Sequence, residues 1–353
     1  MTNRKQAAAL GTLVAGALWA AASHAVVATP AAAESSLNVG ALQLHKGNET
    51  AAVSGTALNL VVTQGATSAN PAKDVTVSAA NTSAKVSSTL TDILTLAEQN
   101  QQAIHPALPM GSPFQITEEV GSGAYVPFTA LTGLPTSTFA GAAASSSGNL
   151  LTGQQHGQLQ AQVGVDDPWM SGMSDSTQAL NTTFIVRNTK AQWFELSFQA
   201  DGFLRAMLGG SDPLASAYAN YHWLATVRPS NSSAAIVEWS PDGKIDALSG
   251  SCISNVLHPC VEYRDDFSLN DSLGVNGLED DVMASFSGGL YQAEFFLDAG
   301  TYIFSIGESV HAEAVDPPVL PEPGTFALLG LGLAGLLRNR RRDQPSMPSF
   351  LMR

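Results

Sequence analysis

The sequence predicts a mainly β protein whose body is an antiparallel β-sandwich. In three windows, apolar and polar residues alternate with the two-residue period of a half-buried strand, as where Glu195, Ser197 and Gln199 separate larger apolar residues. Short strands at this spacing, separated by turn residues and without a βαβ rhythm, are typical of a sandwich. The faces expected to point inward are Phe194, Leu196, Phe198 and Ala200; Ala219, Tyr221, Trp223, Ala225 and Val227; and Tyr291, Ala293, Phe295 and Leu297.

Two turn signals delimit further strands in the same part of the chain. Pro241-Asp242-Gly243 follows a strand predicted for residues 236–239. Asp298-Ala299-Gly300 joins the strand that ends at Leu297 to another predicted for residues 301–306. Because the two strands follow each other so closely, we expect them to pair as a hairpin.

Composition divides the chain near residue 150. Residues 26–150 form a region rich in small residues, with short strands expected at 57–63 and 74–78. Residues 151–316 contain most of the tryptophans and all the alternating windows. The sandwich domain is therefore assigned to 151–316.

The N-terminal region is expected to contain one helix and one linker. Leu90, Ile93, Leu94 and Ala97 lie at the i, i+3, i+4, i+7 spacing of an amphipathic helix, which predicts a helix over residues 87–103. A patch of Ala, Ser and Gly at 140–148 is typical of a linker or long loop.

The charge of the body excludes one class of partner. Of the 16 basic residues, two lie in the first 25 and five follow Leu337, so nine face 29 acidic residues between Val26 and Glu322, a net charge of −20. A body this acidic repels phosphate backbones, so we expect no nucleic-acid partner.

The first 25 residues have the three parts of a secretory signal peptide. Arg4 and Lys5 are positive, residues 7–22 are apolar and uncharged, and Ser23-His24-Ala25 offers small residues at positions −3 and −1. We expect signal peptidase to cleave after Ala25, and a second candidate site follows Ala33.

The C-terminus also has three parts. Pro321-Glu322-Pro323-Gly324 is a rigid motif, because proline fixes φ and lacks an N–H. Residues 325–337 form an apolar helix candidate that spans about 20 Å, and a hydrocarbon core is about 30 Å thick. With its flanking residues it is a candidate transmembrane helix; a permanent anchor and a buried core helix are the alternatives. A basic cluster, expected on the cytoplasmic side, follows at Arg338, Arg340, Arg341 and Arg342.

In this order, the three parts resemble the PEP-CTERM sorting signal of Gram-negative bacteria that make extracellular polysaccharide. The resemblance covers residues 320–342 and leaves a short polar tail, 343–353, that is longer than expected. It implies transient anchoring in the inner membrane and recognition by an exosortase, a membrane cysteine peptidase that would act near Pro321-Glu322-Pro323. It further implies a destination at the cell surface or in an exopolysaccharide or biofilm matrix, but no function for the body.

Two segments of the body bear looser resemblances. The stretch Phe295 to Gly307 resembles the closing hairpin of small β-sandwich modules in exported bacterial proteins. Glu279-Asp280-Asp281, followed by Ser285-Phe286, is similar to a recurrent element of PEP-CTERM protein bodies. Both imply a sandwich and neither implies a reaction.

Cys252 and Cys260 are the only cysteines of the chain. In an exported protein the first interpretation is a disulfide that closes a short loop. Loop entropy for about nine residues then contributes roughly 2.5 kcal/mol. A metal or redox pair is the alternative, although no further cysteine or regularly spaced histidine accompanies the two.

Acidic residues gather in the last part of the body and suggest a calcium site. Ca²⁺ binds several carboxylate and carbonyl oxygens from a bent loop. The spacing here does not match an EF-hand, and an ordinary solvated acidic loop is the alternative. No cofactor is required. The candidate ligands are Asp265, Asp266, Asp271, Asn276, Glu279, Asp280 and Asp281.

We expect a non-enzymatic surface or matrix protein, with many Ser and Thr residues open to glycosylation. The sequence contains no G-x-S-x-G, H-E-x-x-H or P-loop motif, and His222 is expected to be a solvated or packed imidazole rather than a metal ligand. A carbohydrate-binding matrix protein is the second hypothesis, since exposed aromatic rings stack on sugars. A secreted hydrolase of unrecognised type is the third. The aromatic candidates are Trp169, Trp193, Trp223 and Trp239.

Overall fold

The computed structural model describes most of the body between residues 29 and 316. The described residues form strands and turns, and no helix among them is long and apolar enough to cross a membrane. The predicted signal peptide at 1–25, the strand at 57–63 and the tail at 320–353 lie outside the described residues. The described ranges are 29–46, 75–109, 114–122, 124–148, 155–186, 192–210, 212–245, 251–254, 257–277 and 280–316.

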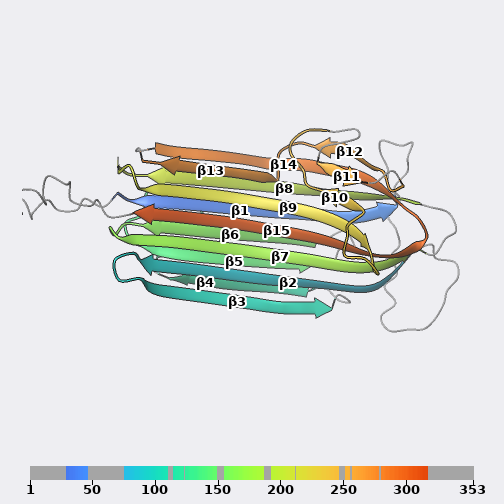
Figure 1. Cartoon of the computed structure of the whole chain (residues 1–353), viewed down its shortest axis with the longest axis horizontal. Coiled ribbons are helices and arrows are strands. Elements are labelled where there is room, and N and C mark those ends of the chain that lie inside the picture. Colours follow the sequence, from blue (N-terminus) through green and yellow to red (C-terminus); the bar gives the residue numbers. More distant parts are fainter. Residues whose placement is uncertain are drawn as a thin grey trace, which may run out of the picture. The chain divides into compact units, whose positions relative to one another are not determined.

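Seven strands form one sheet, in which every neighbouring pair is antiparallel (Figure 1). From one edge to the other they are β12 (Cys260–Asp265), β14 (Asp280–Leu297), β8 (Gln192–Leu208), β1 (Ala31–Lys46), β6 (Gln155–Val165), β5 (Phe139–Gly148) and β4 (Phe114–Ser122).

Eight strands form the second sheet, again with antiparallel neighbours. Seven of them form a continuous path, and the eighth, β13 (Asn270–Asn276), pairs with β9 beside β10. The path across the sheet is β11 (Cys252–Ser254), β10 (Val237–Trp239), β9 (Ser216–Pro229), β15 (Gly300–Asp316), β7 (Met170–Val186), β2 (Val75–Asp92) and β3 (Ala97–Pro109).

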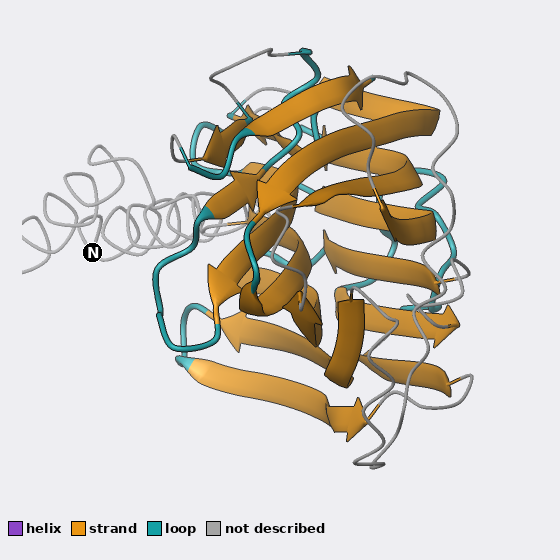
Figure 2. Ribbon diagram, turned by 90° about the vertical axis from the view of Figure 1, so that its right-hand side faces the viewer, coloured by secondary structure: helices purple, strands orange, loops and turns teal. Residues whose placement is uncertain are grey.

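The two sheets enclose one hydrophobic core, and Figure 2 shows their strands from the side. The predicted inward faces are confirmed, because every residue predicted to point inward in the three alternating windows is buried. Strand β2 also begins at Val75, within the strand predicted for residues 74–78. The antiparallel sandwich class is therefore correct for the described residues.

Aromatic rings fill one part of the space between the sheets. Phe198 of β8 stacks on Trp223 of β9 with ring centroids 4.5 Å apart, and on Tyr291 of β14 at 4.7 Å. Phe295 of β14 stacks on Phe304 of β15 with centroids 6.4 Å apart. Because β8 and β14 belong to one sheet and β9 and β15 to the other, the Phe198–Trp223 and Phe295–Phe304 contacts join the two layers, whereas the Phe198–Tyr291 contact lies within one sheet.

The helix predicted over residues 87–103 is wrong, because this segment is the end of β2, a turn and the start of β3. Asp92 organises the turn: its Oδ1 accepts the N–H groups of Leu94 and Thr95 at 2.9 and 3.1 Å. Leu94 and Leu96 are exposed there rather than packed. The apolar residues of this segment have helical spacing in the sequence, but the side-chain-to-backbone bonds of Asp92 stabilise a turn instead of a helix.

The linker predicted at residues 140–148 is also wrong, because this segment is β5, an interior strand paired with β4 and β6. Its small residues have neighbours on both faces. A Cβ added to Gly141 would lie 2.1 Å from Cγ of Tyr125, and Ala140, Ala142 and Ala144 are fully buried. A composition typical of linkers here allows close packing.

The hairpin predicted around residues 298–300 is wrong as well. Strand β14 pairs with β8 and β12, whereas β15 pairs with β7 and β9, so the short turn carries the chain from one sheet to the other. Both strands have alternating faces, and alternation alone cannot distinguish a hairpin from such a crossing. The other turn signal is followed: the chain bends at Gly243 with a φ of 83°.

The change in composition near residue 150 does not separate two structural units. Strand β1 lies between β6 and β8, and β2 pairs with β7. Ala28–Pro317 forms one compact unit. Strands from both sides of residue 150 therefore share both sheets.

Small residues and serine hydroxyls fill the interior between β5, β6 and β7. Ser174 Oγ of β7 donates to the carbonyl of Gln162 in β6 at 3.0 Å, and Ser176 Oγ donates to the carbonyl of Ala143 in β5 at 2.9 Å. Ser35 Oγ of β1 likewise donates to the carbonyl of Asn220 in β9 at 2.6 Å. A serine side chain is short, so these bonds require the sheets to approach closely.

We predict that Ala144→Leu destabilises the body by roughly 1–3 kcal/mol, because the extra volume overpacks a site facing the opposite sheet. Chemical denaturation measures the loss. Ala299→Leu, at an exposed turn position, serves as the matched control and should change the free energy of unfolding little. Equal effects of the two substitutions would contradict close packing at β5.

Candidate functional site

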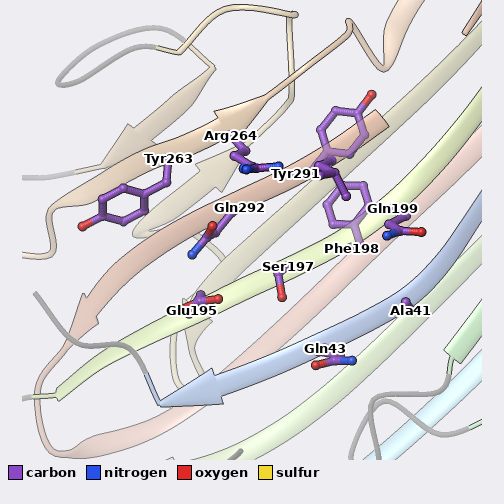
Figure 3. Close-up of a pocket in the computed structure, with 11 residues that line it drawn as sticks. Ala41, Gln43, Glu195, Ser197, Phe198, Gln199, Tyr263, Arg264, Tyr291 and Gln292 are labelled. Atoms are coloured by element: carbon purple, nitrogen blue, oxygen red, sulfur yellow. The ribbon is translucent and has the colours of Figure 1, made fainter. Parts of the chain in front are cut away.

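A groove crosses the outer face of the seven-stranded sheet (Figure 3). Its volume is about 510 Å³, and strands β1, β8, β12 and β14 contribute its lining. Mostly polar side chains face it, and two core rings, Phe198 and Tyr291, lie at its base. The remaining lining residues are Ala41, Gln43, Glu195, Ser197, Gln199, Tyr263, Arg264, Leu290 and Gln292.

Irregular strand pairing shapes this face. The register of β1 shifts between Gly40 and Gln43, where Ala41 has a positive φ of 53°. The register of β12 shifts between Glu262 and Arg264, so that Tyr263 is the extra residue of a bulge. Bulges of this kind bend a strand and redirect its side chains. The two shifts lie at the β1 and β12 sides of the groove.

Glu195 is a carboxyl group that lines the groove and has a shifted pKa. Burial raises its pKa, and a hydrogen bond from Gln292 offsets part of the rise. Glu294 of β14 lies directly opposite Glu195 in the strand register. Glu294 is only 1% exposed, and its Oε2 accepts a hydrogen bond from Tyr263 Oη at 3.3 Å.

This arrangement suits hydrogen-bonded binding better than catalysis by paired carboxyl groups. Acid–base catalysis by two carboxyl groups needs both within reach of the substrate. Of these two groups only Glu195 lines the groove, since Glu294 is buried. Amide, hydroxyl and guanidinium groups supply the other polar contacts. In the described part of the chain, no group of three or more His, Cys, Asp and Glu residues is placed to hold a metal ion.

Two of the predicted calcium ligands serve backbone groups instead. Asp265 Oδ2 accepts the N–H of Asp242 at 2.8 Å, and Asp266 Oδ2 accepts the N–H of Leu290 at 2.9 Å. Each carboxylate therefore ties the end of β12 to a neighbouring segment.

The remaining predicted ligands lie on other strands. Asp271 is an exposed residue of β13 in the eight-stranded sheet, whereas Asp280 and Asp281 begin β14 in the other sheet. Asp281 forms a bidentate pair with Arg205, with a closest distance of 2.7 Å. Glu279 lies outside the described residues. The described members of the acidic set thus do not converge on one point.

The tryptophans predicted as sugar platforms do not line the groove. Trp223 and Trp239 are 0% and 2% exposed and belong to the core. Trp193 is partly buried against the ring of Phe296, with centroids 5.3 Å apart. The backbone N–H of Trp169 donates to the backbone carbonyl of Asp316 at 3.0 Å, and the residue is partly buried. Core packing decided the place of the two largest inward-facing rings.

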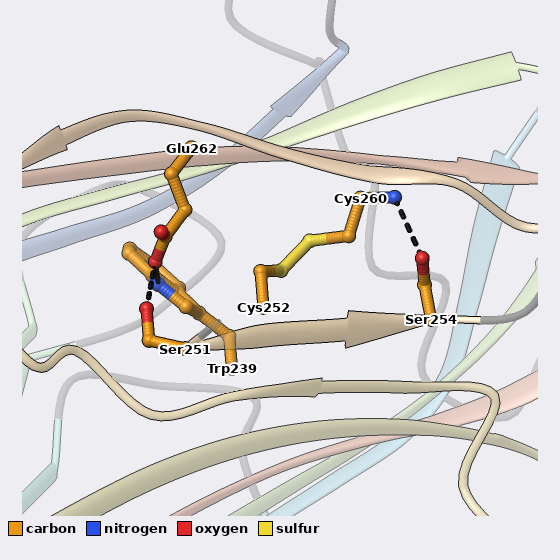
Figure 4. Close-up of a disulfide and its surroundings, with 6 residues drawn as sticks. All are labelled: Trp239, Ser251, Cys252, Ser254, Cys260 and Glu262. Carbon is orange, nitrogen blue, oxygen red and sulfur yellow. Dashed lines mark hydrogen bonds between the residues drawn. A yellow bond between two sulfur atoms is a disulfide. The ribbon is translucent and has the colours of Figure 1, made fainter. Parts of the chain in front are cut away.

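Cys252 and Cys260 form a disulfide, with their Cα atoms 6.0 Å apart (Figure 4). It joins β11 of one sheet to β12 of the other. Beside it, the buried Glu262 accepts hydrogen bonds from Trp239 Nε1 and Ser251 Oγ. The disulfide and this carboxylate together hold the short β10 and β11 strands against the core.

Another buried carboxylate, that of Glu34 in β1, holds the loop that contains Leu131 over the outer face of the seven-stranded sheet. Glu34 is 1% exposed; its Oε1 accepts hydrogen bonds from Gln160 Nε2 and Gln162 Nε2 at 3.1 and 2.9 Å. Its Oε2 accepts the N–H of Leu131 at 2.8 Å. Since both oxygens are bonded within the chain, this cluster is structural.

Sequence reasoning missed the groove although it placed part of its lining. The alternating pattern put Glu195, Ser197 and Gln199 on the outer face of β8, which the structure confirms. Gln292 has the same alternating position in β14. The missing information was the pairing of β8 with β14 and β1, which unites side chains from distant parts of the sequence.

Comparison with known proteins adds information at the C-terminus alone. Residues 319–342 match the family model of the PEP-CTERM protein-sorting motif, so the chain carries the sorting tail that its sequence suggested. No curated protein matches the chain in a sequence search, and no solved structure matches it. The fold and groove of the body therefore stand on the structure itself.

We predict that replacing Asp265 flattens the pH dependence of stability. Burial raises its pKa from 3.8 to about 6, with Glu262 and Asp242 adding to the rise. Because its pKa is higher in the folded state, its contribution is present at low pH and is lost as the pH rises from about 4 to about 6. The free energy of unfolding of the wild type should fall across this window more than that of Asp265→Asn. Identical slopes would contradict the raised pKa.

Proposed function

We propose that this chain is an exported protein, processed by an exosortase at its C-terminus, whose body serves as a non-enzymatic structural or interaction module at the cell surface or in an extracellular matrix. The match of residues 319–342 to the sorting motif carries the proposal. That motif implies a membrane peptidase of the exosortase type as a processing partner. Signal peptidase at Ala25 is the partner proposed for the other end.

The start of the folded body supports cleavage after Ala25 over cleavage after Ala33. Residues 31 to 33 are fully buried, and they pair with β6 on one side and β8 on the other. The N–H of Thr29 also donates to Asp316 Oδ2 at 3.1 Å. A mature chain that began after Ala33 would lack these contacts.

Carbohydrate binding is a second candidate function, and the groove of Figure 3 favours it. Its amide and carboxyl side chains offer paired donors and acceptors, as hydroxyl groups of a sugar require. Tyr263 adds a partly exposed ring at one side. This places the proposed binding surface on strand faces, away from the buried tryptophans.

Substitution of the motif tests the sorting proposal. We predict that Pro321→Ala, Glu322→Ala and Pro323→Ala together leave an uncut C-terminus in the membrane fraction of the native host. The intact mass of the wild type from the surface or medium fraction should lack both the first 25 residues and the sequence beyond about residue 323.

Proline substitutions beyond the motif provide the matched control. Pro345→Ala with Pro348→Ala should leave processing unchanged, because these residues follow the arginine cluster. A wild-type protein that retains its C-terminus in the inner membrane would refute exosortase processing and make the tail a permanent anchor.

The groove is tested by titration with extracellular polysaccharide from the host. We predict that Arg264→Ala and Gln292→Ala each weaken binding several-fold in calorimetry, because each removes hydrogen-bond donors from the groove. Gln102→Ala, an exposed glutamine on β3 of the other sheet, should bind like the wild type. Absence of heat with the wild type would remove carbohydrate binding as a function of this groove.

A further inference from the structure

A polar cluster lies in the interior between the sheets, away from the groove. Glu308 of β15 stands directly between Gln178 of β7 and Trp223 of β9 in the strand register. Ser146 of β5 reaches the cluster from the opposite sheet. Gln178, Glu308 and Ser146 are 4%, 6% and 1% exposed, so water has little access to them.

The cluster contains one close contact and two unpartnered oxygens. Gln178 Nε2 donates to Ser146 Oγ at 2.7 Å. Gln178 Oε1 and Glu308 Oε2 have no hydrogen-bond partner. Both approach Gly157 of β6, where an added Cβ would lie 3.1 Å from the first and 3.0 Å from the second. Leaving buried polar atoms unpartnered is costly, which marks the place as chemically unusual.

A proton on Glu308 reconciles these two oxygens. Two buried acceptors without a donor are both costly, whereas a neutral carboxyl group can donate to an amide carbonyl. Burial raises the pKa of Glu308 to about 7, so its neutral form is well populated near neutral pH. The Trp223 indole offsets part of the rise, although Trp223 Nε1 lacks a partner of hydrogen-bond geometry.

We propose that Ser146 and Gln178 form an intramolecular ester that joins the two sheets covalently. Ser146 Oγ bonds to Cδ of Gln178, and the bond from Cδ to Nε2 breaks. The hydroxyl proton of Ser146 passes to Nε2, which leaves as ammonia. No oxidant or further reactant is needed, since a hydroxyl and an amide become an ester and ammonia.

Ser146 and Gln178 are in contact, and Glu308 is the register partner of Gln178 in the neighbouring strand. Ser146 Oγ is 2.7 Å from the leaving nitrogen, which places it beside the carbon that carries that nitrogen. Glu308 acts as a catalytic acid by donating to Gln178 Oε1 as negative charge develops there. The buried site keeps water from the product, so hydrolysis of the ester is slow.

Intact mass of the folded full-length protein tests the cross-link. The measured mass should be lower, by one ammonia molecule, than the mass calculated for the same chain with its disulfide formed. Cleavage before aspartate, after denaturation and reduction, should leave fragments 92–165 and 175–200 joined, since the first contains Ser146 and the second Gln178. Alkaline hydroxylamine, which cleaves esters, should separate them. The proposal is overturned if, after prolonged incubation near neutral pH, the protein has not lost the mass of one ammonia molecule and the two fragments are separate.

Three variants assign the roles. Ser146→Ala removes the nucleophile, and Glu308→Gln removes the acid at nearly constant volume. Neither variant should lose ammonia, so each should have the mass calculated from its sequence. Ser174→Ala is the control, because it removes another buried β7 serine hydroxyl that bonds across the sheets and should keep the ammonia loss. If Ser146→Ala does not fold, Glu308→Gln still decides the matter: joined fragments in that variant exclude acid catalysis by Glu308.

Discussion

Close approach of the two sheets between β5, β6 and β7 is the constraint on which the rest of the body depends. The hydroxyl groups of Ser174 and Ser176 reach main-chain carbonyls of the opposite sheet directly. Only small residues on β5 leave room for these bonds, and Ala142 and Ala144 supply them. Toward β9 and β14, rings such as Trp223 and Phe198 take over the filling of the core. The sandwich thus combines a polar, closely packed part with an aromatic part.

This division of the interior also determines where chemistry is available. The closely packed part keeps Gln178, Ser146 and Glu308 out of water, and Gln178 contacts Ser146 across the sheets. The aromatic part supports the sheet under the outer groove, where Glu195 and its polar neighbours face solvent. We propose ligand binding for the outer face and covalent stabilisation for the interior.

Sequence patterns predicted what depends on neighbours along one strand. The alternation around Phe194, Tyr221 and Tyr291 identified inward faces correctly, because burial on one side of a strand follows a period of two. Sequence patterns gave wrong predictions where the fold depends on pairing with strands that are distant in the chain. Alanine and serine in β5 resembled a linker because the facing sheet was unknown, and the turn before Gly300 resembled a hairpin because the crossing was unknown. The groove was missed for the same reason.

Hydrogen–deuterium exchange of the mature body tests the close packing of the sheets most directly. We predict that the amides of β5, at residues 139–148, exchange as slowly as those of β6 and β7, and more slowly than those of the edge strand β3. An interior strand bonded on both sides and covered on both faces can exchange only through large opening. Rapid exchange across 139–148, at the rate of an exposed loop, would contradict a core built on these small residues.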